Sequence, residues 1–290
     1  MTRVLVLGGT GMLGQMMLKV LRSDPSLMVD ATQRRSRSDA LWLDAASPHQ
    51  RLQALLRVTA PYAFVVNCIG LTKPDIDESD HRSVERATRL NALFPHELAG
   101  VALEAGSRVI HISTDGVFRG DAEAYFEDGA HDCVDVYGKT KSLGEVMAAH
   151  VLTVRCSIIG PDPDGKQGLV EWLREQPEGA RVPGYTDRLW NGVTTAQFAR
   201  LCHAIITRKV FDVIREEAPT HHFCPNRPVS KYRLLQILKD VYKKDVTITP
   251  SRGPGAPAQR ILRTRYRRLA ELGGSDLLLE DELQALAHWW

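Results

Sequence analysis

The sequence predicts an α/β fold in which helices cover both faces of a parallel sheet. In the first half of the chain, short apolar runs alternate with patterns typical of amphipathic helices. The runs consist almost entirely of Val, Ile and Leu, which is the composition of strands buried on both faces. A glycine-rich turn follows the first run directly. Together these observations favour a doubly wound parallel sheet.

The elements of the first half follow from these patterns in order. We expect strands at 3–7, 27–32, 40–43, 62–68, 108–113 and 151–157. Helical patterns lie between them, at 12–21, 49–58, 83–105 and 136–149. Because strands and helices alternate, each helix is expected to cross over the sheet and return the chain to a parallel strand.

The second half of the chain loses this alternation. It holds a short helix at 169–174, a polar and aromatic stretch at 182–192, late strands at 221–224 and 246–249, and a closing helix over 277–290. Thr194 with Gln197 predicts a capping box for a helix at 196–206, and Ser230 predicts the cap of a helix at 231–242.

Composition limits the class of protein. The chain has 290 residues, which is long enough for a large core and a second domain. Its net charge of +2 favours neither nucleic acid nor an anionic membrane as a partner. Its five cysteines form no CxxC pair, as in reduced cytosolic proteins. With no signal peptide and no apolar stretch long enough to span a bilayer, we expect a cytoplasmic protein.

The glycine turn after the first strand predicts a dinucleotide site. Gly8 allows a tight turn, Gly11 lets the backbone approach a pyrophosphate, and Gly14 lets the helix pack close to the strand. The helix N-terminus then offers N–H groups to the phosphates, with Thr10, Met12 and Leu13 at the same turn. We therefore predict a Rossmann-type domain over 1–160, with 192–224 returning to it, and a smaller substrate-binding α/β part over 161–290.

The loop after the second strand predicts the cofactor. An enzyme selective for NAD often places a carboxylate there, but this chain has Arg34, Arg35 and Ser36. Arginines suit the 2′-phosphate of NADP(H) by charge and by fork geometry, so NADP(H) is preferred over NAD(H). A solvated basic loop is the alternative. Asp44, after the third strand, either bonds the adenine amine or caps the next helix.

A second group of residues predicts proton transfer. Thr114 lies between Ser113 and Asp115 at the end of a strand, and Tyr137 and Lys141 follow on one face of the next helix. A cation beside a phenol lowers the pKa of the phenol, which makes Tyr137 a usable acid. Thr114 would hold a carbonyl oxygen, Tyr137 would donate the proton, and Lys141 would recharge Tyr137 while bonding the nicotinamide ribose.

Four segments resemble the extended short-chain dehydrogenase/reductase family, and within it the dTDP-4-dehydrorhamnose reductase group of sugar-nucleotide 4-ketoreductases. They are GGTGMLG (8–14), HISTDGVFRG (111–120), VYGKTKSLGE (136–145) and VRCSIIG (154–160). The resemblance implies that Thr114, Tyr137 and Lys141 are catalytic and that Ser113 and Asp115 contact the substrate. Where this group usually has tyrosine after Ser-Thr-Asp, this chain has Gly116.

The resemblance also implies further binding residues. Asn67, Cys68 and Ile69 would lie along the cofactor, and Asn91 would be a structural or relay group in its helix. The stretch GYTDRLWNGVTT (184–195) is similar to the substrate loop of the group, where the residues facing the nucleotide-sugar would be Tyr185, Arg188, Trp190 and Asn191.

Two further features have plain interpretations. Adjacent His221 and His222 point to opposite faces of a strand, so we expect them to pack rather than to bind a metal, and no metal site is predicted. The apolar end Trp289-Trp290 fits either docking on the body of the fold or the surface of a homodimer.

The sequence thus predicts an NADPH-dependent reductase of the 4-keto group of a nucleotide-activated 6-deoxysugar, which would make a polysaccharide or glycoconjugate precursor. One alternative is a non-catalytic regulatory subunit of the same fold, although such a subunit need not keep Thr114, Tyr137 and Lys141. Another is a nucleotide-sugar epimerase or a dehydratase. A dehydratase would need a carboxylate pair beside Thr114, but Asp115 is followed by Gly116.

Overall fold

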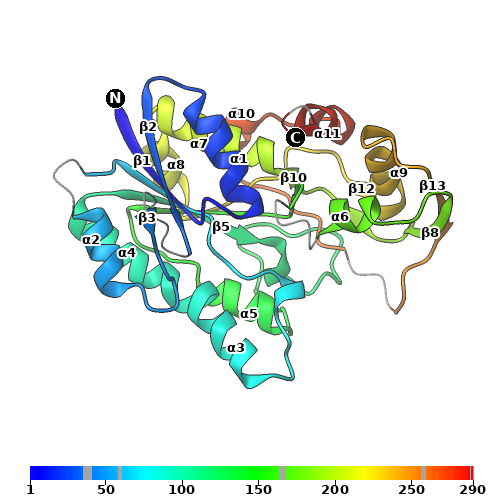
Figure 1. Ribbon diagram of the computed structural model, residues 1–290, viewed down its shortest axis with the longest axis horizontal. Coiled ribbons are helices and arrows are strands. Elements are labelled where there is room, and N and C mark those ends of the chain that lie inside the picture. The colour runs from blue at the N-terminus through cyan, green and yellow to red at the C-terminus, as the bar shows by residue number, and fades with distance from the viewer. Residues whose placement is uncertain (35–40, 58–60, 163–167, 256–258, 288, 290) are drawn as a thin grey trace.

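A seven-stranded parallel sheet forms the centre of the molecule. The computed structural model describes residues 1–34, 41–57, 61–162, 168–255, 259–287 and 289. The strand order is β11-β6-β5-β4-β1-β2-β3 (Figure 1). The strands are β1 (Thr2–Leu7), β2 (Leu27–Gln33), β3 (Leu41–Trp42), β4 (Phe64–Asn67), β5 (Arg108–Thr114), β6 (Val151–Cys156) and β11 (Thr220–His222). The predicted doubly wound α/β fold is confirmed.

The strand order reverses between β1 and β4. From β1 the chain adds β2 and β3 on one side, then returns to place β4 on the other side of β1. The register sets Val4 opposite both Val29 and Phe64, so β1 is paired along both edges. In open α/β sheets, ligands bind at the carboxyl ends of the strands at such a reversal. Here that point holds the glycine turn.

Helices cover both faces of this sheet (Figure 1). One face packs on α1 (Met12–Arg22), α7 (Thr195–Thr207) and α8 (Phe211–Glu217), and its core includes Met16 and Phe198. The other face has a core that includes Leu52 and Phe94 and is covered by α2 (His49–Leu56), α3 (His81–Ala87), α4 (Phe94–Ala105) and α5 (Val136–Leu143).

The C-terminal part stands beside the carboxyl ends of the central strands (Figure 1). It contains two-stranded pairings of β8 with β13, β9 with β12 and β7 with β10. Its elements are β7 (Ile158–Ile159), α6 (Leu169–Arg174), β8 (Ala180–Tyr185), β9 (Leu189–Trp190), β10 (Val193–Thr194), β12 (Val229–Ser230), α9 (Lys231–Val241), β13 (Val246–Ser251) and α11 (Leu279–Ala287). Helix α10 (Arg267–Gly273) packs against α7 and α8 instead. The caps predicted at Thr194 and Ser230 are confirmed.

Several predicted helices differ from those observed. The helix expected over 83–105 begins at His81 and contains a π-helical turn, Thr88–Leu93, between α3 and α4. The helix expected over 136–149 ends at Leu143, because Gly144 takes its C-cap position against the backbone of Asn91. Helix α8 was not expected from the sequence.

The chain end docks on the first helix. The carbonyl oxygen of Trp289 accepts a hydrogen bond from Lys19 Nζ in α1. The Trp289 side chain is 38% exposed. In the described part of the chain, no helix is long and apolar enough to cross a membrane.

Gly14→Ala should destabilise the protein. A Cβ at Gly14 would overlap the carbonyl group of Gly8, and backbone cannot move aside as a side chain can. We expect a loss on the order of 2–3 kcal/mol in the free energy of unfolding, measured by urea denaturation. Gly100→Ala is the matched control, because Gly100 is also inside a helix but an added Cβ there meets nothing within 4 Å. This variant should raise the free energy of unfolding by about 0.5–1 kcal/mol. Equal effects of the two variants would contradict the close contact between Gly14 and the carbonyl group of Gly8.

Candidate active site

The end of β5 presents the first group of the site. Thr114 is the last residue of β5 and caps a single 3-10 turn, Asp115–Val117, where its Oγ1 accepts the N–H of Gly116 at 3.0 Å. The hydroxyl also donates to Asp115 Oδ1 at 3.2 Å. Burial raises the pKa of the Asp115 carboxyl, while Arg260 and the Thr114 hydroxyl lower it. The turn therefore fixes the orientation of a buried threonine hydroxyl at the carboxyl edge of the sheet.

Helix α5 places Tyr137 and Lys141 beside this turn. Asp135 starts the helix, since its Oδ1 accepts the N–H of Gly138 at 2.7 Å. Glu78, from the loop after β4, accepts the N–H of Val136 at 2.9 Å. Carboxylates are favourable at a helix N-terminus because they meet unpaired N–H groups and the positive end of the dipole. Two acidic residues therefore hold the first turn of the helix that carries the tyrosine.

Lys141 is buried at the centre of the site. Its side chain is 5% exposed, and its Nζ donates to the carbonyl oxygen of Ile112 in β5 at 2.8 Å. Burial lowers the pKa of Lys141 to about 8, partly offset by Glu145. A group with this pKa can both hold and release a proton near neutral pH, which suits a proton relay.

Tyr137 differs from the sequence expectation in its acidity. Burial raises the pKa of its phenol, Asp115 raises it further, and only the hydrogen bond with Thr114 lowers it. The sequence predicts a pKa lowered by Lys141, whereas in the structure burial sets the direction of the shift, because it disfavours the charged phenolate. Tyr137 is held in its neutral form, which is the form that donates a proton.

Gly116 packs directly against the tyrosine. A Cβ at this position would lie 2.9 Å from Cε1 of Tyr137 and 3.2 Å from the Thr114 hydroxyl oxygen. The ring of Tyr137 thus occupies the space that a side chain at 116 would need.

Asn91 connects three segments around Lys141. Its Oδ1 accepts the N–H of Leu71 at 2.8 Å, and its Nδ2 donates to the Leu71 carbonyl at 3.1 Å and to Thr140 Oγ1 at 3.3 Å. It lies in the π-helical turn, a feature frequent at functional sites. Its side-chain amide thus joins the loop after β4 to α5. This contact fits the structural role, one of the two roles (structural or relay) that the resemblance implies for Asn91.

The glycine turn provides a phosphate cradle. Gly8 has φ +78° and faces Ile69 and Cys68 of the loop after β4. Gly11 is the N-cap of α1, with no side-chain cap and no acidic residue in the first turn. An anion at this end would therefore meet N–H groups and the positive end of the helix dipole without competition. These residues fit a dinucleotide pyrophosphate.

Side chains predicted along the cofactor lie in several environments. Thr10 and Arg34 are exposed, but Leu13 packs in the core, so only its backbone faces the turn. Asn67 is fully buried and orders its own loop by accepting the N–H of Ile69 at 3.1 Å. Asp44 is exposed and accepts the N–H of Ala46, without capping α2. Arg35 and Ser36 lie outside the described residues.

One residue of the predicted substrate loop reaches the catalytic end of β5. Trp190 is 7% exposed, and its indole N–H donates to Ser157 Oγ at 2.8 Å. Ser157 in turn bonds Asp115 and lowers its pKa. Lys231 Nζ lies 5.7 Å from the centre of the Trp190 ring. Trp190 therefore links the C-terminal part to Asp115.

Three other residues proposed as substrate contacts have different roles in the structure. Asn191 is buried and exchanges two hydrogen bonds with the backbone of Leu262, so its side-chain amide is engaged within the protein. Arg188 donates to the carbonyl oxygen of Pro254. Ser113 is 2% exposed and donates to Glu145, on the sheet face opposite Thr114. Tyr185, at the end of β8, is half-buried.

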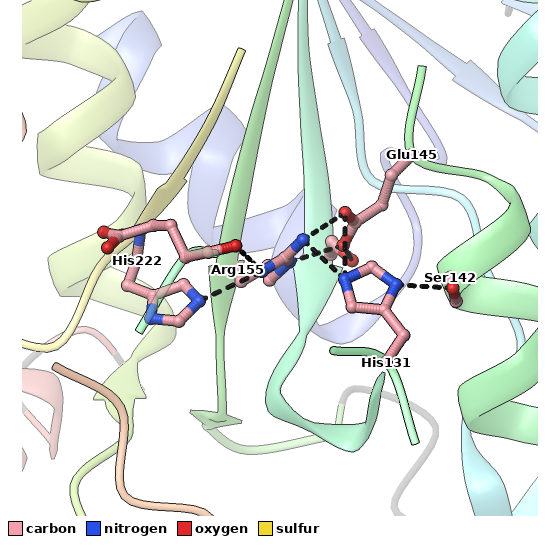
Figure 2. A network of polar contacts seen from close by, with 7 residues as sticks. His131, Ser142, Glu145, Arg155 and His222 are labelled. Carbon is pink, nitrogen blue, oxygen red and sulfur yellow. Dashed lines mark hydrogen bonds and ion pairs between the residues drawn. The ribbon is translucent and has the colours of Figure 1, made fainter. Parts of the chain in front are cut away.

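Arg155 forms a buried polar network on that opposite face (Figure 2). We call the Arg155 cluster the set of side chains around it: Ser113, Glu127, His131, Ser142, Glu145 and His222. The guanidinium makes a two-bond pair with Glu145, at 2.8 and 2.7 Å, and contacts Nε2 of both His131 and His222. Because arginine can only donate, both ring nitrogens must accept, so both histidines are neutral.

The neighbouring histidines therefore pack as expected. His221 Nε2 lies 2.9 Å from the carbonyl oxygen of Ile214, and His222 Nδ1 donates to the carbonyl oxygen of Arg263 at 2.8 Å. Burial lowers the pKa of His222 to about 4. Within the described ranges, no group of three His, Cys, Asp or Glu side chains is arranged to hold a metal ion.

Sequence reasoning missed Glu78, Glu145 and Arg155. The signal for Arg155 was present, because a charged residue inside a buried strand requires a partner of opposite charge. Glu78 lies in an acidic loop, and nothing in its local pattern indicates that it reaches α5, 58 residues further along the chain.

Fold and site together define a protein of the extended short-chain dehydrogenase/reductase type. Residues 1–269 match the family model described as the RmlD substrate binding domain, and the chain belongs to this family. The structure superposes on a dTDP-4-dehydrorhamnose reductase from Clostridium acetobutylicum with a TM-score of 0.76, 23% identity and 99% of each chain covered. It also superposes on a dTDP-4-dehydrorhamnose reductase from Bacillus anthracis in complex with NADP, with a TM-score of 0.76, 21% identity and 100% of each chain covered.

Curated relatives have two kinds of name. Methionine adenosyltransferase 2 subunit beta from Xenopus tropicalis is 32% identical over 250 residues, which cover 83% of this chain and 72% of the relative. The probable low-salt glycan biosynthesis reductase Agl14 from Haloferax volcanii is 26% identical over 298 residues, which cover 97% of this chain and 96% of the relative. The family thus includes proteins named as a reductase and proteins named as a subunit of another enzyme.

Acid should destabilise the protein through His222. Its pKa is about 4 when folded and about 6.5 when unfolded, so between these values the unfolded chain binds more protons. The free energy of unfolding should therefore fall as pH is lowered from about 6.5 towards about 4. A cavity of about 320 Å³ beside Glu127, His131 and Arg155 brings solvent to the cluster.

The test is urea denaturation at about pH 7.5 and about pH 5. The wild type should lose roughly 1–2 kcal/mol more than His222→Gln between these values, because the variant has no imidazole to protonate. Titratable groups that do not interact with His222 contribute equally in both proteins, so they cancel in this comparison. Parallel losses in the two proteins would contradict the assignment.

Proposed function

We propose that the protein is an NADPH-dependent reductase of the 4-keto group of a nucleotide-activated 6-deoxysugar, making a precursor for polysaccharide or glycoconjugate synthesis. The observation that carries this proposal is the convergence of Thr114, Tyr137 and Lys141 at the carboxyl edge of the sheet that also holds the glycine turn. Family membership and the similarity to the Haloferax volcanii reductase over nearly the whole chain support it.

Each residue has a separate role in the proposed reaction. Thr114 Oγ1, fixed by Gly116, orients the carbonyl oxygen of the sugar. Tyr137, kept neutral by burial, donates a proton to that oxygen as it gains charge. Lys141, whose pKa is about 8, returns a proton to the phenolate and stabilises it. NADPH supplies the hydride when bound.

We propose that Gly8, Gly11 and Gly14 hold the pyrophosphate and that Arg34, with Arg35 and Ser36, selects the 2′-phosphate. Arg34 is exposed directly after β2, where its guanidinium is accessible to a phosphate group. Trp190, Tyr185 and Asp115 remain our candidates for the nucleotide-sugar. The free cysteines suit a reducing compartment, and we infer the cytoplasm.

A second candidate function is a regulatory subunit. The relative from Xenopus tropicalis, at 32% identity, is named as the beta subunit of methionine adenosyltransferase 2. On this hypothesis the protein would bind NADP(H) and a partner enzyme without turnover. The buried Lys141 and neutral Tyr137 favour the reductase, because a regulatory subunit has no use for a proton relay.

Tyr137→Phe should abolish turnover without abolishing cofactor binding. Loss of NADPH absorbance is followed with purified protein and a panel of 4-keto-6-deoxy nucleotide sugars. Removing the proton donor should lower kcat by about 100-fold or more, since general acid catalysis contributes about 10²–10⁴-fold. NADPH binding should stay within about twofold, because the phenol makes no part of the phosphate cradle.

Three outcomes would each contradict a different part of the proposal. A variant that retains wild-type kcat would remove Tyr137 as the proton donor. A wild type that binds NADPH but turns over no member of the panel would favour the regulatory subunit. Equal affinity for NADH and NADPH would contradict the role of Arg34 and its neighbours.

A further inference from the structure

The Arg155 cluster is joined to the catalytic residues at two points. Ser113 directly precedes Thr114 in β5, and Glu145 follows the end of α5, four residues beyond Lys141. Ser113 Oγ donates to Glu145 Oε1 at 2.6 Å. The same carboxylate is held by Arg155 Nε at 2.8 Å. One carboxylate therefore ties the end of the strand that carries Thr114 to the helix that carries Tyr137.

The cluster is built as a rigid unit. Arg155 and Glu145 have side chains that are only 5% and 6% exposed. The guanidinium also donates to the carbonyl oxygen of Glu127, so Glu145, Glu127, His131 and His222 together use its donors. Figure 2 shows Arg155 lying between His222 on one side and Glu145 with His131 on the other. A charged network satisfied in this way, in a low dielectric, resists displacement.

We propose that the Ser113–Glu145–Arg155 connection is a positioning element of the active site, which sets the distance of Thr114 from Tyr137 and Lys141. This inference rests on the proposed reductase function. None of its three residues faces the substrate, since Ser113 points to the opposite side of the sheet from Thr114. They act through the backbone of β5 and the end of α5.

The need for such an element follows from the size of α5. The helix has only eight residues and stops at Gly144, so it lacks the later turns that would brace a longer helix against the sheet. Asp135 and Glu78 hold its first turn, and Glu145 holds the segment just beyond its last turn. A displacement of about 1 Å between reacting groups can cost about 10²-fold in rate.

Ser113→Ala tests the connection with a small change. It removes one hydrogen bond and leaves the Glu145–Arg155 ion pair in place. We expect kcat to fall about tenfold, while KM for the sugar and the dissociation constant of NADPH stay within about twofold, because only the geometry of the reacting groups changes. Amide hydrogen exchange of Val136–Leu143 should increase by a measurable factor.

Ser107→Ala is the matched control. Ser107 directly precedes the other end of β5, is 1% exposed, and donates to the carbonyl oxygen of Tyr62 at 2.7 Å. Its loss removes an equally buried serine hydrogen bond next to the opposite end of β5 from Thr114. This variant should show a similar fall in Tm but unchanged kcat and unchanged exchange in α5.

The outcomes separate the two proposals. Equal kcat in Ser113→Ala and Ser107→Ala, or a change in KM alone, would overturn the positioning role. Unchanged exchange of α5 in Ser113→Ala would also overturn it, and this readout needs no substrate. A wild type without turnover would overturn the reductase, and hydrogen exchange would still decide whether Ser113 holds α5.

Discussion

The close approach of α5 to its neighbours is the constraint on which the site depends. A Cβ at Gly138 would overlap the carbonyl oxygen of Gly116, and a Cβ at Gly144 would overlap that of Asn91. At both ends of this short helix, backbone therefore meets backbone directly. Only glycine permits this contact, which brings the Tyr137 ring against the turn after β5 and Lys141 within reach of the Ile112 carbonyl.

Burial of the titratable groups follows from the same packing. With α5 against the end of β5, Lys141 and the phenol of Tyr137 lose solvent together, and burial becomes the largest cause of both pKa shifts. Burial disfavours each charged form, so the pKa of Lys141 falls and that of Tyr137 rises. At neutral pH the phenol is therefore protonated, and Lys141, whose pKa is about 8, can exchange a proton.

Periodic and local features of the sequence predicted much of this structure. The parallel sheet, the glycine turn, the Thr194 capping box and the position of Tyr137 and Lys141 one turn apart all depend on neighbouring residues. The family resemblance predicts that Asn191 and Ser113 contact the substrate. Their hydrogen-bond partners in the structure, Leu262 and Glu145, are 71 and 32 residues away along the chain. Motifs and periodicity describe only neighbouring residues, so they could not predict these contacts.

The glycine at position 116, where the resembled group has tyrosine, affects the position of Tyr137 rather than the size of a substrate pocket. A missing side chain suggests a wider substrate pocket, but here the nearest atoms to an added Cβ belong to Tyr137 and to Thr114. The space is filled by the catalytic ring itself. A tyrosine at this position, as the resembled group has, would require the phenol of Tyr137 to shift. The glycine and the placement of Tyr137 therefore depend on each other, and the space beside Gly116 is not available to a ligand while the ring of Tyr137 occupies it.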